Sequence, residues 1–551
     1  MHIGALIPHI ARHARERGAD TAISKGRAEA GFHVTTWAEL WRRTEGWAAF
    51  LDTAAADQHL VPVLAGKSAD SIAAGLGLMA SGRAFSFVNP KYRMPQVAAV
   101  LAAVAPRVCV IDATGLLALR GVADNTALVG RTTWLLIGGD PPTSVHAAAL
   151  RDLRAAANVV EVPEPFATAP PIDGAAAPAV DRVGACLFTS GSTGEPKGVL
   201  VSEADLIGRA EAEIDWFGLD RSDVLLSLLP FSFDVGLNQL LTALAVGAEL
   251  VLLESWLPAD ILAATAARGV TGISGVPAIW QDLVNSGLRF DGTGPHARLR
   301  YLTVSGGSLA PRALDALRDV APGVGIFKTY GQTEAFRATS LRPEEIERVS
   351  GSVGRAFPGA RVYVVDDDGG LCAPGDEGEV VHTGLGVMMG YLRGAELRPD
   401  PADKLRANPF FGPDDLAPNA IFTGDIGVLD GEGYLFLKGR RDGMVKVMGN
   451  RVYPEEVAKE LAALPGVVDA AVAGAVGADG LGLLIGFVAL KEGAESTPAR
   501  FRKWLGAKLP GFMIPRRFVV VDHIPRGATG KPAIRQLLEE HGGAAAGSDD
   551  T

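Results

Sequence analysis

Short apolar, β-branched segments alternate with Ala- and Leu-rich helical segments through most of this 551-residue sequence, which predicts an α/β fold. From about residue 350 the pattern changes to short strands separated by Asp-Gly and Pro-Gly turns, typical of a small β unit. After about residue 443 a compact unit of roughly a hundred residues mixes helices and strands. We therefore expect a large N-terminal domain of parallel-rich sheets sandwiched by helices, including the β unit, and a small α+β domain at the C-terminus.

The expected elements follow the chain in a regular order. An amphipathic helix opens the sequence, and a Pro/Ala-rich linker or surface loop occupies residues 162–180. The strand-like segments of the large domain are 61–66, 84–90, 107–112, 134–139, 185–188, 198–202, 225–230, 247–254, 269–277 and 299–307, with helical segments at 69–82 and 95–106. In the small domain we expect helices at 454–464 and 497–509 and strands at 469–476, 483–490 and 517–522. The tail 541–551 is rich in Gly and Ala and is expected to be disordered.

Composition excludes several classes of protein. The net charge of −11, with no long basic tract, argues against a nucleic acid partner. Cys109, Cys186 and Cys372 are far apart, which argues against a disulfide framework or a zinc site and fits a reducing, cytoplasmic compartment. The N-terminus lacks the pattern of a secretory signal, and aspartates and glycines interrupt the apolar segment 467–490. We therefore expect no membrane association.

The segment TSGSTGEPKG, residues 189–198, holds three glycines, four hydroxyl side chains and a lysine between two strand-like segments. Glycines let a ligand approach the backbone closely, and N–H groups, hydroxyls and a lysine suit a polyphosphate. A Walker A loop is excluded because two residues separate Gly194 from Lys197, and Gly198 stands where a Ser or Thr should bind Mg²⁺. The alternative is an ordinary surface loop.

Four further motifs follow in order along the chain. KTYGQTEA places the ring of Tyr330 and the carboxylate of Glu334 beside a glycine, a combination suited to a planar base and to Mg²⁺. Asp425 is expected at the end of an apolar strand, where its carboxylate suits ribose hydroxyls. Basic residues cluster within 438–457, and Lys531 follows a Thr-Gly turn. Taken singly, each has a structural alternative: a surface turn, a helix cap or a solvated charge.

Together and in this order, the five motifs resemble those of the adenylate-forming superfamily, which includes acyl-CoA synthetases, amino-acid adenylation domains and luciferases. The similarity spans about residues 10–540. It implies activation of a small carboxylic acid with ATP and Mg²⁺ and release of pyrophosphate. It also implies an N-terminal domain over 1–438, a hinge at 439–442 centred on Asp442, and a mobile C-terminal domain over 443–540. The small domain of this superfamily rotates between an adenylate-forming and a thioester-forming pose.

The resemblance also assigns roles to individual residues. The terminal phosphates of ATP would lie against Thr189, Ser190, Gly191, Ser192, Thr193, Gly194 and Lys197. Adenine would stack on Tyr330 among Gly306, Gly307, Gly331, Gln332 and Thr333, and the ribose would bind Asp425 and Arg440. The catalytic set would be Lys531, Glu334, Thr193 and Lys197, with Glu334 as the Mg²⁺ ligand and Lys531 between the substrate carboxylate and the α-phosphate. These cations would stabilise the charge that develops when two anions are brought together.

Asp234 follows a Phe-Ser-Phe string, the position at which amino-acid adenylation domains pair with the amino group of the substrate. Because a buried carboxylate is costly unless a cation meets it, an ammonium substrate is favoured over the alternative that Asp234 caps the following helix. The resemblance gives a polar pocket formed by Asp234, Val235, Asn238, Ser274, Thr303, Ser305, Thr329, Phe336, Arg337 and Lys531. Arg337 is either the partner of a second substrate carboxylate or a structural residue.

The acid and the acceptor of the acyl group stay open. Amino-acid adenylation domains usually carry a Pro-Leu-Asp-Pro-like string, and this chain reads SFVNPKYRMPQV there, which places it between the amino-acid and acyl-CoA branches. No carrier-protein serine motif follows Lys531, so we expect any carrier to act in trans. The leading hypothesis is an enzyme that adenylates an amino acid, β-amino and acidic ones included, and loads a separate carrier protein. The alternatives are an acyl-CoA ligase for an acid without an amine and a catalytically silent relative.

Overall fold

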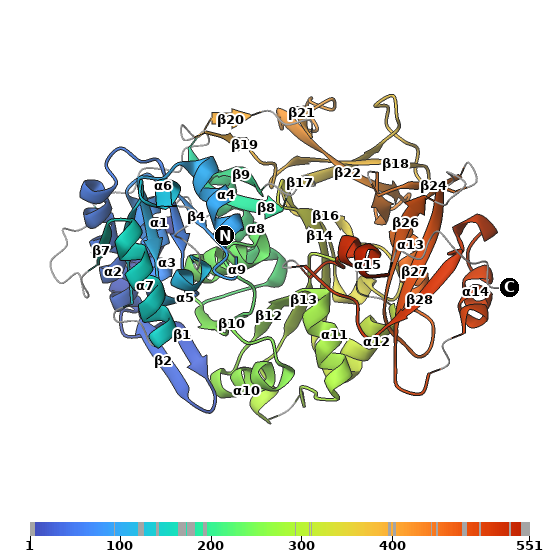
Figure 1. Cartoon of the computed structure of the whole chain (residues 1–551), viewed down its shortest axis with the longest axis horizontal. Coiled ribbons are helices and arrows are strands. Elements are labelled where there is room, and N and C mark those ends of the chain that lie inside the picture. Colours follow the sequence, from blue (N-terminus) through green and yellow to red (C-terminus); the bar gives the residue numbers. More distant parts are fainter. Residues whose placement is uncertain are drawn as a thin grey trace.

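The structure, a computed structural model, describes residues 6–92, 94–119, 126–138, 143–162, 172, 182–190, 196–292, 294–307, 309, 311–394, 398–400, 404–441, 443–447, 450–476, 482–494, 497–527 and 530–541. The predicted α/β architecture is confirmed: Figure 1 shows a large domain of sheets and helices with a small domain at one end of the molecule. Two nine-stranded sheets and a five-stranded sheet belong to the large domain, and a three-stranded sheet is the centre of the small one.

The first nine-stranded sheet has the order β20-β19-β9-β8-β4-β3-β5-β6-β7. The strands from β8 to β7 are parallel, and β9, β19 and β20 extend the sheet as an antiparallel edge. Its strands are β3 (Leu60–Leu64), β4 (Ala84–Phe87), β5 (Val108–Ile111), β6 (Thr133–Leu136), β7 (Val159–Glu161), β8 (Val183–Ser190), β9 (Pro196–Ser202), β19 (Gly390–Arg393) and β20 (Arg398–Asp400). The helices between these strands are α3 (Ala69–Ala80), α4 (Met94–Val104), α5 (Ala113–Ala118), α6 (Thr126–Val129) and α7 (Ser144–Ala156).

The second nine-stranded sheet has the order β16-β15-β14-β13-β12-β10-β11-β1-β2, with parallel pairing from β14 to β1. Its strands are β1 (Thr21–Arg27), β2 (Gly31–Thr36), β10 (Val224–Ser227), β11 (Glu249–Leu252), β12 (Gly272–Gly275), β13 (Tyr301–Val304), β14 (Gly325–Gln332), β15 (Ala335–Leu341) and β16 (Arg355–Ala356). The helices of this part are α1 (Leu6–Glu16), α2 (Trp37–Ala54), α8 (Glu203–Phe217), α9 (Asp234–Val246), α10 (Pro258–Arg268), α11 (Pro277–Ser286) and α12 (Pro311–Val320).

Helix α9 packs against strands of both large sheets. Every residue of α9 is buried, and its leucines share one hydrophobic core with strands of both sheets. An apolar sequence with almost no polar face, LNQLLTALAV, explains why this helix is covered on all sides. The packing fixes the N-terminus of α9, and with it Asp234, at the end of strand β10.

The five-stranded sheet is antiparallel and consists of β17 (Ala360–Val365), β18 (Glu377–Gly384), β21 (Leu405–Ala407), β22 (Asn419–Leu429) and β23 (Leu435–Arg440). The small domain has its own hydrophobic cores and contains β24 (Val445–Val447), β25 (Asn450–Val452), α13 (Pro454–Ala462), β26 (Val467–Val476), β27 (Gly482–Leu490), α14 (Pro498–Gly506), β28 (Arg517–Val521) and α15 (Ile534–His541). In Figure 1 it lies beside α11 and α12. No helix within the described residues is long and apolar enough to cross a membrane.

Candidate active site

A cavity of about 1720 Å³ lies where the parallel strands of the second sheet end and where the small domain meets the large one. Loops after the carboxyl ends of parallel strands are the usual place for ligands in α/β folds. The lining comes from the loops after β10, β12 and β13, from the β14–β15 hairpin, from β22 and β23, and from α13 and the loop before α15. Both domains therefore contribute to one site.

The predicted phosphate loop joins two paired antiparallel strands, β8 and β9. We expected a ten-residue loop, and this extent was wrong: β8 continues to Ser190, β9 begins at Pro196, and Thr189 pairs with Lys197. The expected residues Gly191, Ser192, Thr193 and Gly194 lie outside the described residues. Thr189 lines the cavity. The Nζ atom of Lys197 lies 5.4 Å from the centre of the Tyr391 ring, on the neighbouring strand β19.

Tyr330 and Gln332 come from the end of β14, and Thr333 and Glu334 form the turn that leads into β15. A Cβ atom on Gly331 would lie 2.4 Å from the backbone nitrogen of Arg337, so only glycine fits this turn. All five residues from Tyr330 to Glu334 line the cavity. The KTYGQTEA motif is therefore a tight hairpin whose tip faces the cavity.

Asp425 is the centre of a hydrogen-bonded group. We expected it at the end of a strand, but it lies in the middle of β22, opposite Arg440 of β23. Oδ2 of Asp425 accepts hydrogen bonds from Tyr330 Oη (2.6 Å) and Gln332 Nε2 (2.7 Å), and Oδ1 accepts one from Arg440 Nη1 (3.1 Å). Burial and the Asp425 carboxylate raise the pKa of Tyr330, so its hydroxyl keeps its proton. The antiparallel register thus places Arg440 opposite Asp425, and Tyr330 of the other sheet joins them through its hydroxyl.

Glu334 is an anion in a half-enclosed position. Its Oε1 accepts a hydrogen bond from Tyr391 Oη (2.7 Å) and faces Lys404 Nζ at 3.4 Å. Burial opposes the charge, but Lys404 and the Tyr391 hydroxyl outweigh it and lower the pKa of Glu334. Within the described residues, no three His, Cys, Asp or Glu side chains are placed to hold a metal ion together. A single carboxylate fits Mg²⁺ that takes its other ligands from phosphates and water.

Little space is left for a side chain at Gly306, another residue of the cavity lining. Gly306 has a φ of +77°, and a Cβ atom there would lie 3.3 Å from the ring of Phe233. Gly307 also lines the cavity. The neighbouring hydroxyls of Ser305 and Thr329 are hydrogen-bonded to each other at 2.7 Å. This part of the cavity wall therefore combines backbone and small polar groups with the ring of Phe233.

Asp234 is the first residue of α9 and lines the cavity with an exposed fraction of only 7%. Its Oδ1 accepts a hydrogen bond from the N–H of Val235 at 2.8 Å, and Phe233, not Asp234, holds the N-cap position. Burial raises the pKa of Asp234, against the opposing effects of that N–H and of Arg209 and Arg337. A buried carboxyl group therefore faces the predicted acid pocket.

The predicted pocket residues divide into two groups. Val235, Ser305, Thr329, Phe336, Arg337 and Lys531 line the cavity together with Asp234. Asn238, Ser274 and Thr303 are buried but are not among the residues that line it. Both polar atoms of the Asn238 amide lack a hydrogen-bond partner among the described residues.

Arg337 has partners inside the protein. It forms an ion pair with Glu213 of α8, and the rings of Phe217, Phe336 and Phe357 lie 5.4 Å from its guanidinium. Its side chain is 2% exposed. A guanidinium already matched by a carboxylate is a poor partner for a second substrate carboxylate. This geometry favours the structural alternative for Arg337.

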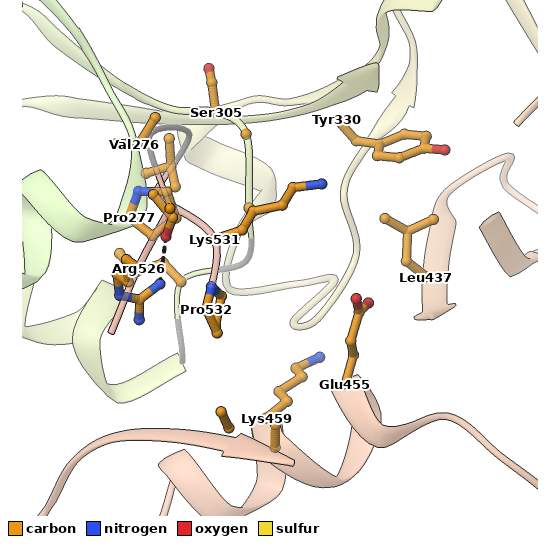
Figure 2. Close-up of a pocket in the computed structure, with 18 of the residues that line it drawn as sticks. Val276, Pro277, Ser305, Tyr330, Leu437, Glu455, Lys459, Arg526, Lys531 and Pro532 are labelled. Atoms are coloured by element: carbon orange, nitrogen blue, oxygen red, sulfur yellow. Dashed lines mark hydrogen bonds between the residues drawn. The ribbon is translucent and has the colours of Figure 1, made fainter. Parts of the chain in front are cut away.

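Lys531 extends from the small domain into the cavity, toward the space between Ser305 and Tyr330 (Figure 2). The turn before it is closed by hydrogen bonds from Gly527 N–H to the Lys531 carbonyl and from Arg526 to the Gly530 carbonyl. A Cβ atom on Gly530 would lie 3.5 Å from Val276 of the large domain. The small domain is therefore placed so that Lys531 faces the group around Tyr330.

Residues 10–392 match the family described as AMP-binding enzyme, and residues 456–531 match the AMP-binding enzyme C-terminal domain. The chain belongs to the AMP-binding enzyme family. It is 32% identical over 502 residues to CymA of Salinispora arenicola, named as a probable nonribosomal peptide synthetase, covering 90% of this chain and 6% of that protein. It is 31% identical over 357 residues to the indoleacetate–CoA ligase of Aromatoleum aromaticum, covering 64% of this chain and 66% of that protein.

Solved structures agree with this family membership. ATP-bound MatB of Rhodopseudomonas palustris is 25% identical, with a TM-score of 0.79 over 99% of this chain and 100% of that one. The amide bond synthetase McbA of Marinactinospora thermotolerans is 24% identical, with a TM-score of 0.76 over 98% of this chain and 100% of that one. At this identity the similarity establishes only a shared fold. The relatives thus share the architecture of this AMP-binding enzyme while their names differ in product.

Sequence reasoning missed several residues of this AMP-binding enzyme that contact the predicted site. Tyr391 and Lys404 both reach Glu334, and Glu213 pairs with Arg337. Each lies outside the motifs, in a segment whose distance from the site depends on strand pairing or helix packing. The one available signal was that Tyr391 directly follows the glycine of GYLRG, near the start of a short strand. Glu455 and Lys459, which Figure 2 shows rising from α13 toward the cavity, carried no signal.

Proposed function

We propose that this AMP-binding enzyme activates a carboxylic acid bearing an amino group, using ATP to form an acyl-adenylate and release pyrophosphate. We further propose that it passes the acyl group to the phosphopantetheine thiol of a separate carrier protein. The observation that carries the choice of acid is the state of Asp234, a carboxyl group that faces the cavity and is almost fully buried.

The charges around Asp234 support an ammonium substrate. Arg209 forms an ion pair with Asp205, and Arg337 forms one with Glu213, so each buried arginine has its own carboxylate. Within the described residues, no ion pair includes Asp234. Burying an unmatched carboxylate is costly, and a substrate cation at this point would offset that cost. Because Arg337 is already paired with Glu213, the site also disfavours an acid that would place a second carboxylate next to Arg337.

On the nucleotide side, the roles follow the geometry of the β14–β15 hairpin and of β22. Tyr330 would stack on one side of adenine, with Gly306 and Gly307 lining the other side, and Asp425 with Arg440 would bind the ribose. Thr189, Lys197 and the tip of the β8–β9 hairpin would hold the terminal phosphates. Glu334 would hold Mg²⁺, which when bound neutralises phosphate charge as pyrophosphate leaves.

Lys531 would stabilise the charge that develops as the acid carboxylate attacks the α-phosphate. It comes from the small domain, so its presence depends on the position of that domain. We propose domains at 1–438 and 443–540, joined by a hinge at 439–442, with rotation of the small domain between the two half-reactions. The proposed pivot Asp442 lies outside the described residues, as does the tail after His541.

The decisive test is ATP–pyrophosphate exchange over a panel of α-amino acids, β-amino acids and simple carboxylic acids. We expect exchange with at least one amino acid, and loss of that exchange in Asp234→Asn while the nucleotide still binds. Exchange only with acids that lack an amine would reject the ammonium pairing and favour the alternative, an acyl-CoA ligase. That alternative is supported by the similarity to the indoleacetate–CoA ligase.

The acceptor requires a separate measurement. Purified enzyme with the preferred acid and ATP would be offered CoA in one reaction and phosphopantetheinylated carrier proteins in another. We expect a thioester on a carrier protein, detected by intact-protein mass spectrometry. Efficient acyl-CoA formation with no carrier loading would reject the carrier proposal and leave the adenylation step unaffected.

A further inference from the structure

Lys404 lines the cavity beside Glu334 and Gln332 and lies outside every motif of the sequence. Its Nζ atom is 3.4 Å from Oε1 of Glu334 and 3.4 Å from Oε1 of Gln332. The side chain is 30% exposed and lines the cavity. One ammonium group therefore faces the cavity while it contacts residues on both the metal side and the ribose side of the proposed site.

The backbone of Lys404 is held by the same strands that hold Asp425. Lys404 immediately precedes β21, and its carbonyl accepts a hydrogen bond from the N–H of Phe422 at 2.8 Å. Phe422 belongs to β22, three positions before Asp425. Strand pairing thus fixes the position of the Lys404 backbone relative to Asp425, so that the position of its side chain does not depend on a loop.

Gln332 connects Lys404 to Asp425. Its Nε2 donates hydrogen bonds to Oδ2 of Asp425 (2.7 Å) and to the carbonyl of Thr423 (2.9 Å). A side-chain amide has its donor and its acceptor at opposite ends, so this orientation turns Oε1 toward Lys404. Because the ammonium group of Lys404 can only donate hydrogen bonds, it can bond only to the oxygen of the Gln332 amide. Lys404 thereby fixes the orientation in which Gln332 supports Asp425.

Lys404 acts on Glu334 together with Tyr391. Both donors reach the same carboxylate oxygen, Oε1. Two donors on one oxygen restrict rotation of the carboxylate and favour its anionic form. The ring of Tyr391 also faces the ammonium group of Lys197 in β9, so Tyr391 contacts both Glu334 and the β8–β9 hairpin.

We propose that Lys404 is a positioning residue that couples the ribose-side carboxylate Asp425, through Gln332, to the metal-side carboxylate Glu334. The proposal rests on the nucleotide site proposed above. Without the ammonium, Gln332 loses the contact that sets its orientation and Glu334 loses one of its two donors. Nucleotide binding then weakens at the ribose end even where no metal is present.

The test uses AMP as the probe, titrated calorimetrically into the full-length protein in EDTA. Removing the metal and the terminal phosphates restricts the measurement to the adenosine end and the α-phosphate. We expect Lys404→Met to bind AMP about tenfold more weakly, the usual effect of losing one charged hydrogen bond. Lys404→Arg should recover affinity to within about threefold, because the charge and the donors return.

Two controls separate positioning from other effects. Arg406→Met, two residues further along in β21 and with its guanidinium 4.2 Å from the centre of the Phe422 ring, should bind AMP as the wild type does. Gln332→Leu tests the connection: if Lys404 acts through Gln332, the double variant K404M/Q332L should bind AMP no more weakly than Q332L. The melting temperatures of K404M and K404R should match that of the wild type, since Lys404 is partly exposed.

Each outcome decides the proposal. Equal AMP affinity in wild type and K404M overturns it, and so do fully additive losses in the double variant, which would mean that Lys404 contacts AMP independently of Gln332. No AMP binding by the wild type would reject the nucleotide site and the proposal together. Failure of pyrophosphate exchange with every acid, with AMP binding intact, would reject acid activation alone.

Discussion

Arg337 and Glu213 form an ion pair in the interior of the large domain, with side chains that are 2% and 6% exposed. Arg337 has a φ of +40°, an uncommon conformation for a residue other than glycine. Three phenylalanine rings surround the guanidinium, so the pair and its rings offset the cost of this backbone conformation. Because Arg337 lies in β15, two residues after the KTYGQTEA motif, the pair also fixes the hairpin against α8.

Arg337→Met should lower the free energy of unfolding by about 3–5 kcal/mol, because it leaves Glu213 buried without its cation. Chemical denaturation measures this directly. Arg318→Met provides the control: Arg318 lies on α12 and its ion pairs are to exposed carboxylates, so its loss should change stability by less than about 1 kcal/mol. The double variant R337M/E213M should lose less than the sum of the single losses. A stable R337M with impaired use of an acidic substrate would instead place Arg337 in substrate binding.

Asp234→Asn should stabilise the protein at pH 8 and weaken binding of the proposed amino-acid substrate. Burial raises the pKa of Asp234, so its stabilising contribution is present at low pH and is lost as the pH rises through that pKa. Thermal unfolding should therefore show D234N above the wild type at pH 8, with the gap closing as the pH falls. Loss of the charge pair should cost about 2–5 kcal/mol of amino-acid affinity. Asp315→Asn, an exposed aspartate of α12, should show neither effect.

Hydrophobic periodicity predicted the elements of this fold because each element buries one face or all of its surface. The fully buried β3 to β5 and the mostly apolar α9 could be predicted for that reason. The ends of strands were harder to predict from the sequence, because pairing with β23 extends β22 beyond Asp425 and pairing with β9 extends β8 to Ser190.

Motifs predicted which side chains gather at the cavity, but not their partners inside the protein. Glu213 and Lys404 have no local pattern that sets them apart from other charged residues on a helix or beside a strand. Their roles follow from the packing of α8 against β15 and from the pairing of β21 with β22, which are contacts between distant segments. The sequence also predicted pocket residues that do not line the cavity. These are Asn238, Ser274 and Thr303, which the structure buries elsewhere.

Lys67 should make the stability of this protein depend on pH. Its Nζ donates hydrogen bonds to the carbonyls of Ser227 (2.6 Å) and Leu253 (2.8 Å), at the ends of β10 and β11. Complete burial lowers its pKa to about 7, although Glu254 acts in the opposite direction. A depressed lysine pKa contributes stability at high pH that is lost as the pH falls toward about 7.

Between pH 9 and pH 7 the wild type should therefore lose up to about 1.4 kcal/mol per pH unit relative to Lys67→Met, which carries no titrating group. Urea denaturation at three pH values measures the slope. Lys25→Met removes an exposed lysine nearby and should keep the wild-type slope. Parallel pH profiles for K67M and the wild type would show that Lys67 stays charged in the folded protein.

Lys531→Ala should separate the two proposed half-reactions. The side chain is exposed in the cavity and comes from the small domain, so its removal leaves the large domain and its nucleotide contacts unchanged. Loss of one charge contact at the reacting phosphate typically costs on the order of 10²–10³ in rate, and pyrophosphate exchange should fall by that factor. Thioester formation from a supplied acyl-adenylate should continue, because that step no longer involves attack on the phosphate. Arg535→Ala, on α15 and paired with Glu539 in solvent, should leave both steps intact. Equal loss of both steps in K531A would reject the assignment of Lys531 to the first half-reaction.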